Sequence, residues 1–210
     1  MERLMARGAE ADLFLGRWLG HEAVVKVRPP RGYRHERLDV ALRARRTLRE
    51  AELLVAAKLA GVPTPQLFFV DAKGMKLVMG RVKGRRLKEL LERSPSRALP
   101  LFQQLGRHVA LLHRSGIMHG DLTTSNVFVS DDGVLVLIDF GLSYRSQREE
   151  DMAVDIHLLK SVLEGAHTRS ARRAFSLFMK GYAELLGDAA PRILKRVSEI
   201  ERRGRYAREG

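Results

Sequence analysis

One segment in the second half of the chain constrains the fold more than any other. It runs from Ile117 to Gly141 and reads IMHGDLTTSNVFVSDDGVLVLIDFG. Asp121 lies five residues before Asn126, and Asp139 opens an Asp-Phe-Gly triplet after an apolar run. Carboxylate and amide oxygens are the ligands that magnesium prefers in proteins. A fold that brings these three side chains together can bind magnesium and orient a nucleophile.

The same spacing occurs in enzymes that transfer a phosphoryl group from ATP. In protein kinases, an Asp of the catalytic loop accepts the proton of the substrate hydroxyl. An Asn further along binds one magnesium ion, and the Asp of Asp-Phe-Gly binds the metals that bridge the phosphates. We therefore predict Asp121 as the catalytic residue, Asn126 and Asp139 as magnesium ligands, and ATP with Mg as cofactors. The alternative is that Asp121 and Asn126 only cap turns, but it does not explain the position of Asp139.

A lysine in the first half of the chain is predicted to bind the phosphates of ATP. Lys26 lies among valines in the strand-like stretch Glu22–Arg28, where a lysine has little reason to point inward unless an anion meets it. In kinases such a lysine is held by a glutamate from a helix. Glu50 is our choice for that partner, and Glu52 competes because helix periodicity does not decide between them. The alternative is a surface lysine on the polar face of an alternating strand.

The segment expected to cover the phosphates departs from the usual pattern. A kinase normally has Gly-x-Gly-x-x-Gly at this place, whereas this chain reads GAEADLFLG from Gly8 to Gly16. Gly8, Ala9 and Glu10 are predicted to contact ATP, and so is Met79 at the end of a predicted strand. The Glu10 carboxylate would repel a phosphate unless magnesium or a lysine lies between them.

The hydrophobic pattern predicts an α+β fold with the two-lobed layout of a minimal protein-kinase-like domain. Short alternating runs predict strands at residues 12–16, 22–28, 66–70, 75–79, 127–129 and 134–138. Helical spacing predicts helices at residues 39–60, 87–93, 97–114 and 151–203, the last broken near Gly165 and Gly187. A connector at residues 80–84 separates a strand-rich N-terminal lobe (1–79) from a helical C-terminal lobe (80–210) with a basic tail.

Two features restrict the predicted activity. Gly120 replaces the Arg of His-Arg-Asp, and the activation segment after Gly141 is truncated, because a helical pattern resumes near Asp151 and no Ala-Pro-Glu follows. We therefore expect an enzyme that is not switched by loop phosphorylation and that lacks the usual platform for peptides. Asp155 and His119 are predicted to support the catalytic loop, with an exposed helix position as the alternative for Asp155.

The chain is strongly basic, with 38 Lys and Arg against 25 Asp and Glu and a net charge of +13. This charge exceeds what one ATP requires, so we expect a polyanionic partner such as RNA. In the basic tail, Arg202, Arg203, Arg205 and Arg208 are candidate contacts with RNA or a partner, and a solvated chain end is the alternative.

The lack of cysteine excludes disulfides and thiolate metal sites. No apolar run is long enough for a membrane span, so we expect no membrane partner and a cytoplasmic location.

These motifs together resemble one family, the small atypical serine/threonine kinases of the KEOPS (EKC) complex, or PRPK-like family. The similarity covers almost the whole chain and includes the segments GAEA, VVKVR, RGYRHERLD, REAELL, GVPTP, HGDLTTSN, IDFGLS, EDMAVD and RRGR. The resemblance implies a minimal two-lobed kinase fold that binds ATP with magnesium. It also implies weak serine phosphorylation, including self-phosphorylation, and ATPase activity within the complex. The complex helps to make the threonylcarbamoyl modification on an adenosine of certain tRNAs.

The resemblance also implies roles for particular residues and partners. Lys26 and Glu50 match the lysine–glutamate pair of the family, Asp121 its catalytic Asp, and Asn126 and Asp139 its metal ligands. The unusual phosphate segment is a trait of the family. The implied partners are the other KEOPS subunits, namely the tRNA threonylcarbamoyltransferase catalytic subunit and small accessory subunits. tRNA is implied as a further partner, directly or through the complex.

Two other functions are compatible with the sequence. A small-molecule kinase of the sugar type also has a His-Gly-Asp-Leu loop and needs no peptide platform. An RNA-binding scaffold with a vestigial ATP site would explain the irregular phosphate segment and the basic tail.

Overall fold

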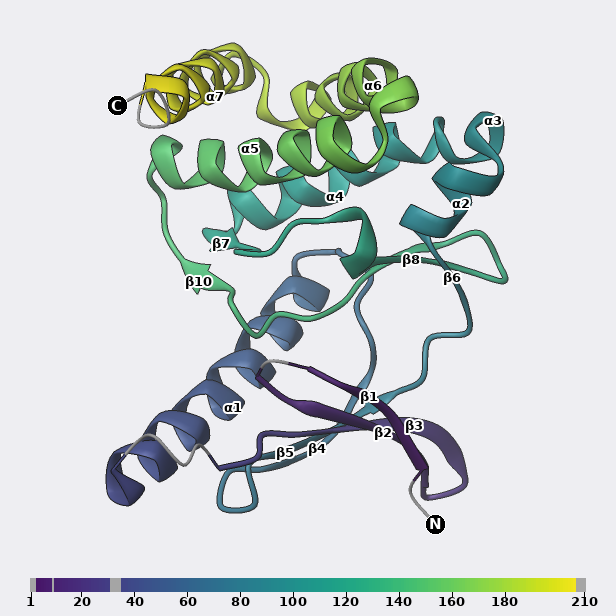
Figure 1. Ribbon diagram of the computed structural model, residues 1–210, viewed down its shortest axis with the longest axis vertical. Coiled ribbons are helices and arrows are strands. Elements are labelled where there is room, and N and C mark those ends of the chain that lie inside the picture. The colour runs from purple at the N-terminus through teal and green to yellow at the C-terminus, as the bar shows by residue number, and fades with distance from the viewer. Residues whose placement is uncertain (1–2, 9, 31–34, 207–210) are drawn as a thin grey trace.

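The computed structural model of the chain describes residues 3–8, 10–30 and 35–206, with side chains as far as residue 203. A strand-rich N-terminal part and a helical C-terminal part lie at opposite ends of the molecule (Figure 1). The predicted α+β class is confirmed. The predicted boundary between residues 79 and 80 falls at the end of a strand and stays a prediction.

The N-terminal part is an antiparallel sheet with strands in the order β1-β2-β3-β5-β4. The strands are β1 (Arg3–Arg7), β2 (Asp12–Trp18), β3 (His21–Val27), β4 (Leu67–Asp71) and β5 (Lys76–Gly80). Helix α1 (Glu36–Leu59) packs against β4 and β5 (Figure 1). Because successive strand residues point to opposite faces, Lys26 lies opposite the buried Ala23 and Val25, and its side chain reaches α1.

Strand β1 is not predicted from the sequence. All its residues are exposed, so it lacks the buried face that produces an alternating pattern. Its structure is decided by pairing with β2. Helix α1 begins at Glu36, earlier than the predicted start at Asp39, and residues 31–34 of the preceding loop lie outside the described residues.

The C-terminal part is mainly helical and carries short strands at its junction with the sheet. The helices are α2 (Leu87–Arg93), α3 (Pro95–Ala98), α4 (Leu101–Arg114), α5 (Glu149–Ala166), α6 (Thr168–Leu186) and α7 (Ala189–Tyr206). The strands are β6 (Gly84–Arg86), β7 (Ile117–Met118), β8 (Val127–Ser130), β9 (Leu135–Leu137) and β10 (Tyr144–Arg145), with a 3-10 turn, η1 (Thr124–Asn126). Strands β6, β8 and β9 form one small sheet, and β7 pairs with β10. No helix in the described part of the chain combines the length and the apolar character that a membrane crossing needs.

One predicted helix in this part is wrong. A single helix over 97–114 does not form, because Pro100 separates α3 from α4 and takes the N-cap position of α4. Proline has no backbone N–H and cannot continue the hydrogen bonds of α3. The predicted break near Gly165 is confirmed, because α5 ends at Ala166 and α6 begins at Thr168. The break at Gly187 is also confirmed, with a φ of 52° at that glycine.

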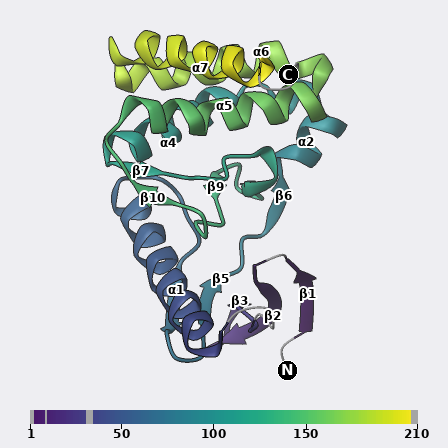
Figure 2. The same cartoon turned by 60° about the vertical axis from the view of Figure 1, so that its left-hand side comes forward.

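Helices α4 and α6 lie very close together because each presents a glycine to the other. A Cβ atom on Gly106 would lie 2.0 Å from the carbonyl oxygen of Phe178, and one on Gly181 would lie 1.8 Å from that of Gln103. Any side chain at either position would push the helices apart. Helix α5 packs against α6 and α7 (Figure 2), so this close contact also sets the position of the helix that follows the predicted active-site loop.

Helix α4 also buries a histidine. His108 is 8% exposed, and its Nδ1 has no hydrogen-bond partner among the described residues. Burial, with a smaller contribution from the charge of Arg107, lowers the pKa of His108 to about 4. Between that pH and the ordinary pKa of 6.5, the unfolded chain binds the proton and the folded chain does not. The contribution of His108 to the free energy of unfolding is therefore complete above pH 6.5 and is lost as the pH falls toward 4.

We expect His108→Leu to weaken the pH dependence of stability. Between pH 7 and pH 4.5 the free energy of unfolding should fall by about 2–3 kcal/mol more in the wild type than in the variant. This value follows because each unit of pKa shift corresponds to about 1.4 kcal/mol. Urea unfolding of both proteins at the two pH values measures this difference. An equal fall in both proteins would contradict a neutral, buried His108.

Candidate active site

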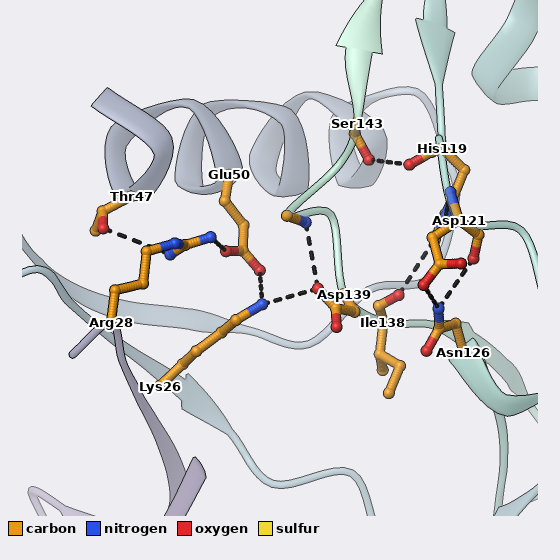
Figure 3. A network of polar contacts seen from close by, with 11 residues as sticks. Lys26, Arg28, Thr47, Glu50, His119, Asp121, Asn126, Ile138, Asp139 and Ser143 are labelled. Atoms are coloured by element: carbon orange, nitrogen blue, oxygen red, sulfur yellow. Dashed lines mark hydrogen bonds and ion pairs between the residues drawn. The ribbon is translucent and has the colours of Figure 1, made fainter. Parts of the chain in front are cut away.

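Lys26 lies at the centre of a chain of ion pairs (Figure 3). Its Nζ is 2.7 Å from Oε1 of Glu50 on α1 and 2.7 Å from Oδ1 of Asp139. Lys26 is only 7% exposed, and burial alone would lower its pKa. The charges of Glu50 and Asp139, and the hydrogen bonds to them, outweigh burial and raise the pKa. The lysine is therefore a cation at neutral pH, as phosphate binding requires.

The structure decides between the two glutamates proposed for Lys26. Glu50 is 1% exposed and faces the lysine. Two residues apart on a helix means about 200° of rotation, so Glu52 lies on another face of α1, where its side chain is 64% exposed and pairs with Arg145 at 3.2 Å. Glu50 is thus the partner, and the surface alternative for Lys26 is wrong.

Asp139, two residues after the end of β9, has an unusual backbone conformation. Its φ is +63°, which is uncommon for a residue other than glycine, and such angles cluster at functional sites. The N–H of Gly141 donates to Oδ1 at 3.3 Å. Burial would raise the pKa of Asp139, but the charge and hydrogen bond of Lys26, with Gly141 and His119, lower it. The carboxylate is therefore ionised, and its side chain is 47% exposed.

Asp121 and Asn126 are held together within one loop (Figure 3). The Nδ2 of Asn126 donates to Oδ2 of Asp121 at 2.7 Å and to the Asp121 carbonyl at 2.9 Å. A side-chain amide has two N–H donors and one oxygen acceptor. Both donors are used here, which leaves the amide oxygen of Asn126 for a cation.

Asp155 supports this loop from α5, as predicted. It is 3% exposed and accepts hydrogen bonds from the backbone N–H groups of His119 at 2.6 Å and Gly120 at 2.8 Å. Burial would raise its pKa, but the contacts with His113 and His119 lower it. Gly120 has a φ of +76°, and a Cβ atom there would lie 2.3 Å from the carbonyl oxygen of Leu142. The alternative of an exposed position for Asp155 is wrong. At position 120, where kinases usually have Arg, the backbone conformation and the close contact with Leu142 require glycine.

His119 links the loop to the strand that carries Asp139. Its Nε2 lies 3.1 Å from the carbonyl oxygen of Ile138, and since a carbonyl only accepts, Nε2 carries the proton. Its Nδ1 then accepts from the N–H of Asp121 at 3.3 Å. The hydroxyl of Ser143 donates to the His119 carbonyl at 2.7 Å (Figure 3). His119 therefore acts by positioning its neighbours.

The predicted phosphate segment lies between β1 and β2 and carries a paired carboxylate. The N–H of Gly8 donates to the carbonyl of Ala11 at 2.9 Å, and Ala9 lies outside the described residues. Oε1 of Glu10 lies 2.7 Å from Nη1 of Arg46 on α1. The charge of Glu10 is thus paired with an arginine of α1.

Two adjoining cavities share Lys26 and Asp139. The larger, of about 520 Å³, is lined partly by the apolar residues Leu13, Val24, Met79 and Ile138. The smaller, of about 300 Å³, is lined by Gly8, Glu10, Ala11, Arg28, Asp121 and others. The apolar side of the larger cavity suits a nucleotide base, although charged residues such as Arg81 and Lys83 also line it. The cations and carboxylates of the smaller cavity suit phosphates with their metal.

The oxygen ligands of the site fit magnesium bound to a nucleotide. Asp139 and Asn126 would each supply an oxygen. The described part of the chain has no group of three or more His, Cys, Asp or Glu that could hold a metal by itself. Magnesium is commonly bound by one or two carboxylates together with substrate phosphates. The residues present are therefore suited to a metal that arrives with ATP.

Two side chains that contact the site or its supporting residues have no place in the sequence-based predictions. Nη2 of Arg28 lies 2.5 Å from Oε2 of Glu50, and the hydroxyl of Tyr182 lies 2.8 Å from Nδ1 of His113. Strand alternation could have found Arg28, because it follows Lys26 by two residues. Tyr182 has no such signal, since it is 69 residues from its partner.

The basic tail is partly paired with acidic side chains. Arg203 on α7 lies 3.1 Å from Glu150 on α5, and Arg202 is exposed. The side chain of Arg205 and the residue Arg208 lie outside the described part. A contact with RNA or a partner stays a prediction for these four arginines.

The fold and site define a protein kinase, and residues 13–162 match the family model described as the protein kinase domain. The crystal structure of the Rio2 kinase–ADP/Mg2+–phosphoaspartate complex from Chaetomium thermophilum has a similar fold, with a TM-score of 0.64 over 98% of this chain and 72% of that chain. Their sequences are 16% identical, so this likeness shows the fold alone.

Among curated proteins, the KEOPS complex subunit Bud32 of Pyrococcus abyssi is 41% identical, over 97% of this chain and 96% of its own length. The EKC/KEOPS complex subunit Tp53rkb of Mus musculus is 36% identical, over 96% and 86%. The chain belongs to this Bud32 family of small protein kinases, as its motifs predicted. A probable bifunctional tRNA threonylcarbamoyladenosine biosynthesis protein of Methanothermobacter thermautotrophicus is 42% identical over 97% of this chain, which spans only 36% of that protein.

Proposed function

We propose that the chain is an ATP- and magnesium-dependent serine/threonine kinase and ATPase that works in the KEOPS complex during threonylcarbamoyladenosine modification of tRNA. One observation carries the enzymatic part of this proposal. Lys26, Glu50 and Asp139 form a continuous series of ion pairs (Figure 3), and Asp121, to which Asn126 is hydrogen-bonded, lines the smaller cavity together with Lys26 and Asp139. A vestigial site would have no need of this arrangement.

Each residue of the site has a role in the proposed reaction. Lys26 binds the α- and β-phosphates, while Glu50 holds the lysine in place. Asp139 and Asn126 hold magnesium, which would shield the phosphate charge when bound. Asp121 accepts the proton of the attacking hydroxyl or water, or orients that nucleophile. Met79 and its apolar neighbours take the base.

The short segment after Gly141 bears on the choice of substrate. It pairs as β10 with β7, and the hydroxyl of Ser146 donates to Asp151 at 2.5 Å, so α5 follows at once. Peptide substrates of kinases normally lie on a longer activation segment at this place. We infer that a protein substrate is positioned by a partner of the chain, or that water is the acceptor and the reaction is ATP hydrolysis.

The proposed partners follow from the relatives. Bud32 and Tp53rkb are named as KEOPS complex subunits, and the bifunctional relatives join a similar chain covalently to further sequence. We therefore propose the tRNA threonylcarbamoyltransferase catalytic subunit and the small accessory subunits as partners, in the cytoplasm. The net charge of +13 is consistent with a position near tRNA.

The test is ATP turnover by the purified chain. With γ-labelled ATP and magnesium, we expect release of phosphate or labelling of the protein, and loss of both when EDTA is added. Adding tRNA and the other KEOPS subunits should raise the rate of phosphate release. No turnover and no nucleotide binding would overturn the enzymatic proposal. Tight tRNA binding without turnover would favour a scaffold, and sugar phosphorylation far above self-phosphorylation would favour a small-molecule kinase.

A further inference from the structure

Arg28 is a buried cation that the proposed reaction does not use. It directly follows β3, and its side chain is only 2% exposed. Its Nε has no hydrogen-bond partner among the described residues. A buried charge destabilises the protein unless it is paired, so the contacts that hold Arg28 require an explanation.

The side chain of Arg28 contacts one face of α1. Nη2 lies 2.5 Å from Oε2 of Glu50, and Nη1 lies 3.4 Å from the hydroxyl of Thr47. The carbonyl of Arg28 accepts from Nη1 of Arg43 at 3.0 Å. Positions 43, 47 and 50 are spaced so that they share one side of a helix. Arg28 thus fastens β3 to two turns of α1 beside the lysine (Figure 3).

Glu50 is shared between two cations. Oε1 meets Lys26 at 2.7 Å, and Oε2 meets Arg28 at 2.5 Å. With Asp139 at the other side of Lys26, the four charges balance. When Lys26 turns to the phosphates of ATP, Arg28 still holds the second oxygen of Glu50. The Glu50 carboxylate therefore keeps its orientation while Lys26 binds the phosphates.

Other kinases control this arrangement through the activation segment. Phosphorylation of that segment, together with the position of the helix, brings the lysine and glutamate into contact. Here Gly120 stands where the Arg that grips the phosphorylated segment would be, and only residues 142–148 separate Gly141 from α5. The lysine–glutamate contact is nevertheless present. The buried guanidinium group of Arg28, through its ion pair with Glu50, can maintain this lysine–glutamate contact.

We propose that Arg28 is a positioning residue that holds Glu50, and through it Lys26, in the ATP-binding arrangement without a phosphorylated activation segment. This inference rests on the proposed ATP-dependent activity. Arg28 also borders the smaller cavity, and a direct contact with the phosphates would make its loss additive to that of Glu50→Gln.

The test is a double-mutant cycle between Arg28 and Glu50, read on kcat and KM for ATP and on the Kd for ATP with magnesium. We expect Arg28→Met to raise KM and lower kcat, with a combined loss in kcat/KM of about 100-fold, as for a small displacement of a catalytic group. Since Arg28 acts through Glu50, adding Arg28→Met to Glu50→Gln should change each quantity by less than threefold. A lower folded fraction alone would reduce kcat and leave KM unchanged.

The matched control is Arg145→Met. Arg145 also pairs with a glutamate of α1, Glu52, at 3.2 Å, but its side chain is 55% exposed. This variant should stay within threefold of the wild type, because exposed ion pairs contribute little. If Arg28→Met fails to fold, Arg28→Lys takes its place in the cycle. A lysine cannot span Glu50 and Thr47 with one fork, so a loss of about tenfold is expected.

Two results would overturn the inference. One is activity within twofold of the wild type for Arg28→Met, or for Arg28→Lys where that variant replaces it. The other is additive losses in the cycle, which would mean that Arg28 acts independently of Glu50. Absence of ATP turnover and binding in the wild type is a separate result, and it would refute the proposed function first.

Discussion

Replacing Asp139 by Asn is expected to lower ATP turnover about 10³-fold while the protein stays folded, because a metal ligand at a phosphoryl group contributes several kcal/mol and about 4 kcal/mol is 10³-fold in rate. The carboxylate is a proposed magnesium ligand and lies 2.7 Å from Lys26. Asp121→Asn should lower turnover by about 10²–10⁴-fold, the usual contribution of a general base. Phosphate release at saturating ATP over a range of magnesium concentrations measures both.

The control for these variants is Asp132→Asn. Asp132 is exposed in the turn between β8 and β9 and lines neither of the two cavities around Lys26, so wild-type turnover is expected. Circular dichroism should show the same helix content for all of these proteins. If Asp121→Asn and Asp139→Asn both kept more than a tenth of the wild-type rate, the assignment of the site would be refuted.

Asp155→Ala is expected to reduce stability by about 3–5 kcal/mol, since each buried donor left without an acceptor costs about 1–3 kcal/mol. The variant orphans the N–H groups of His119 and Gly120 and removes the partner that lies 3.3 Å from His113. The fraction that remains folded should also turn over ATP slowly, because the loop that carries Asp121 loses its support. Urea unfolding at pH 7 gives the free energy of unfolding.

Glu164→Ala is the matched control for Asp155→Ala. Glu164 lies on the same helix, and its side chain is 60% exposed, so a change below about 0.5 kcal/mol is expected. A loss below 1 kcal/mol in Asp155→Ala would show that the loop is held mainly by other contacts, such as the bond from Ser143 to the His119 carbonyl.

Much of the site was open to prediction because its parts are close together in the sequence. Asp121 and Asn126 lie in one loop, and Asp139 follows a strand that begins after the next turn. The chemistry of their side chains and their spacing is sufficient to indicate magnesium and a nucleophile. Helix α1 and the hairpin of β4 and β5 were predicted for the same reason, since their periodicity is local.

Features without a local pattern were missed or misplaced. Strand β1 is exposed along its whole length and is stabilised by pairing with β2. The bond between Tyr182 and His113 joins helices far apart in the chain. No pattern within a short window records such contacts.

The sequence by itself determined the class of the fold, the family and the residue types of the active site, because spacing and side-chain chemistry are local properties. The tertiary structure decided which glutamate meets Lys26, how Glu10 is neutralised and that Arg28 holds Glu50. Those choices depend on how α1 is rotated against the sheet. That rotation is set by packing between segments distant in the chain, and no single segment encodes it.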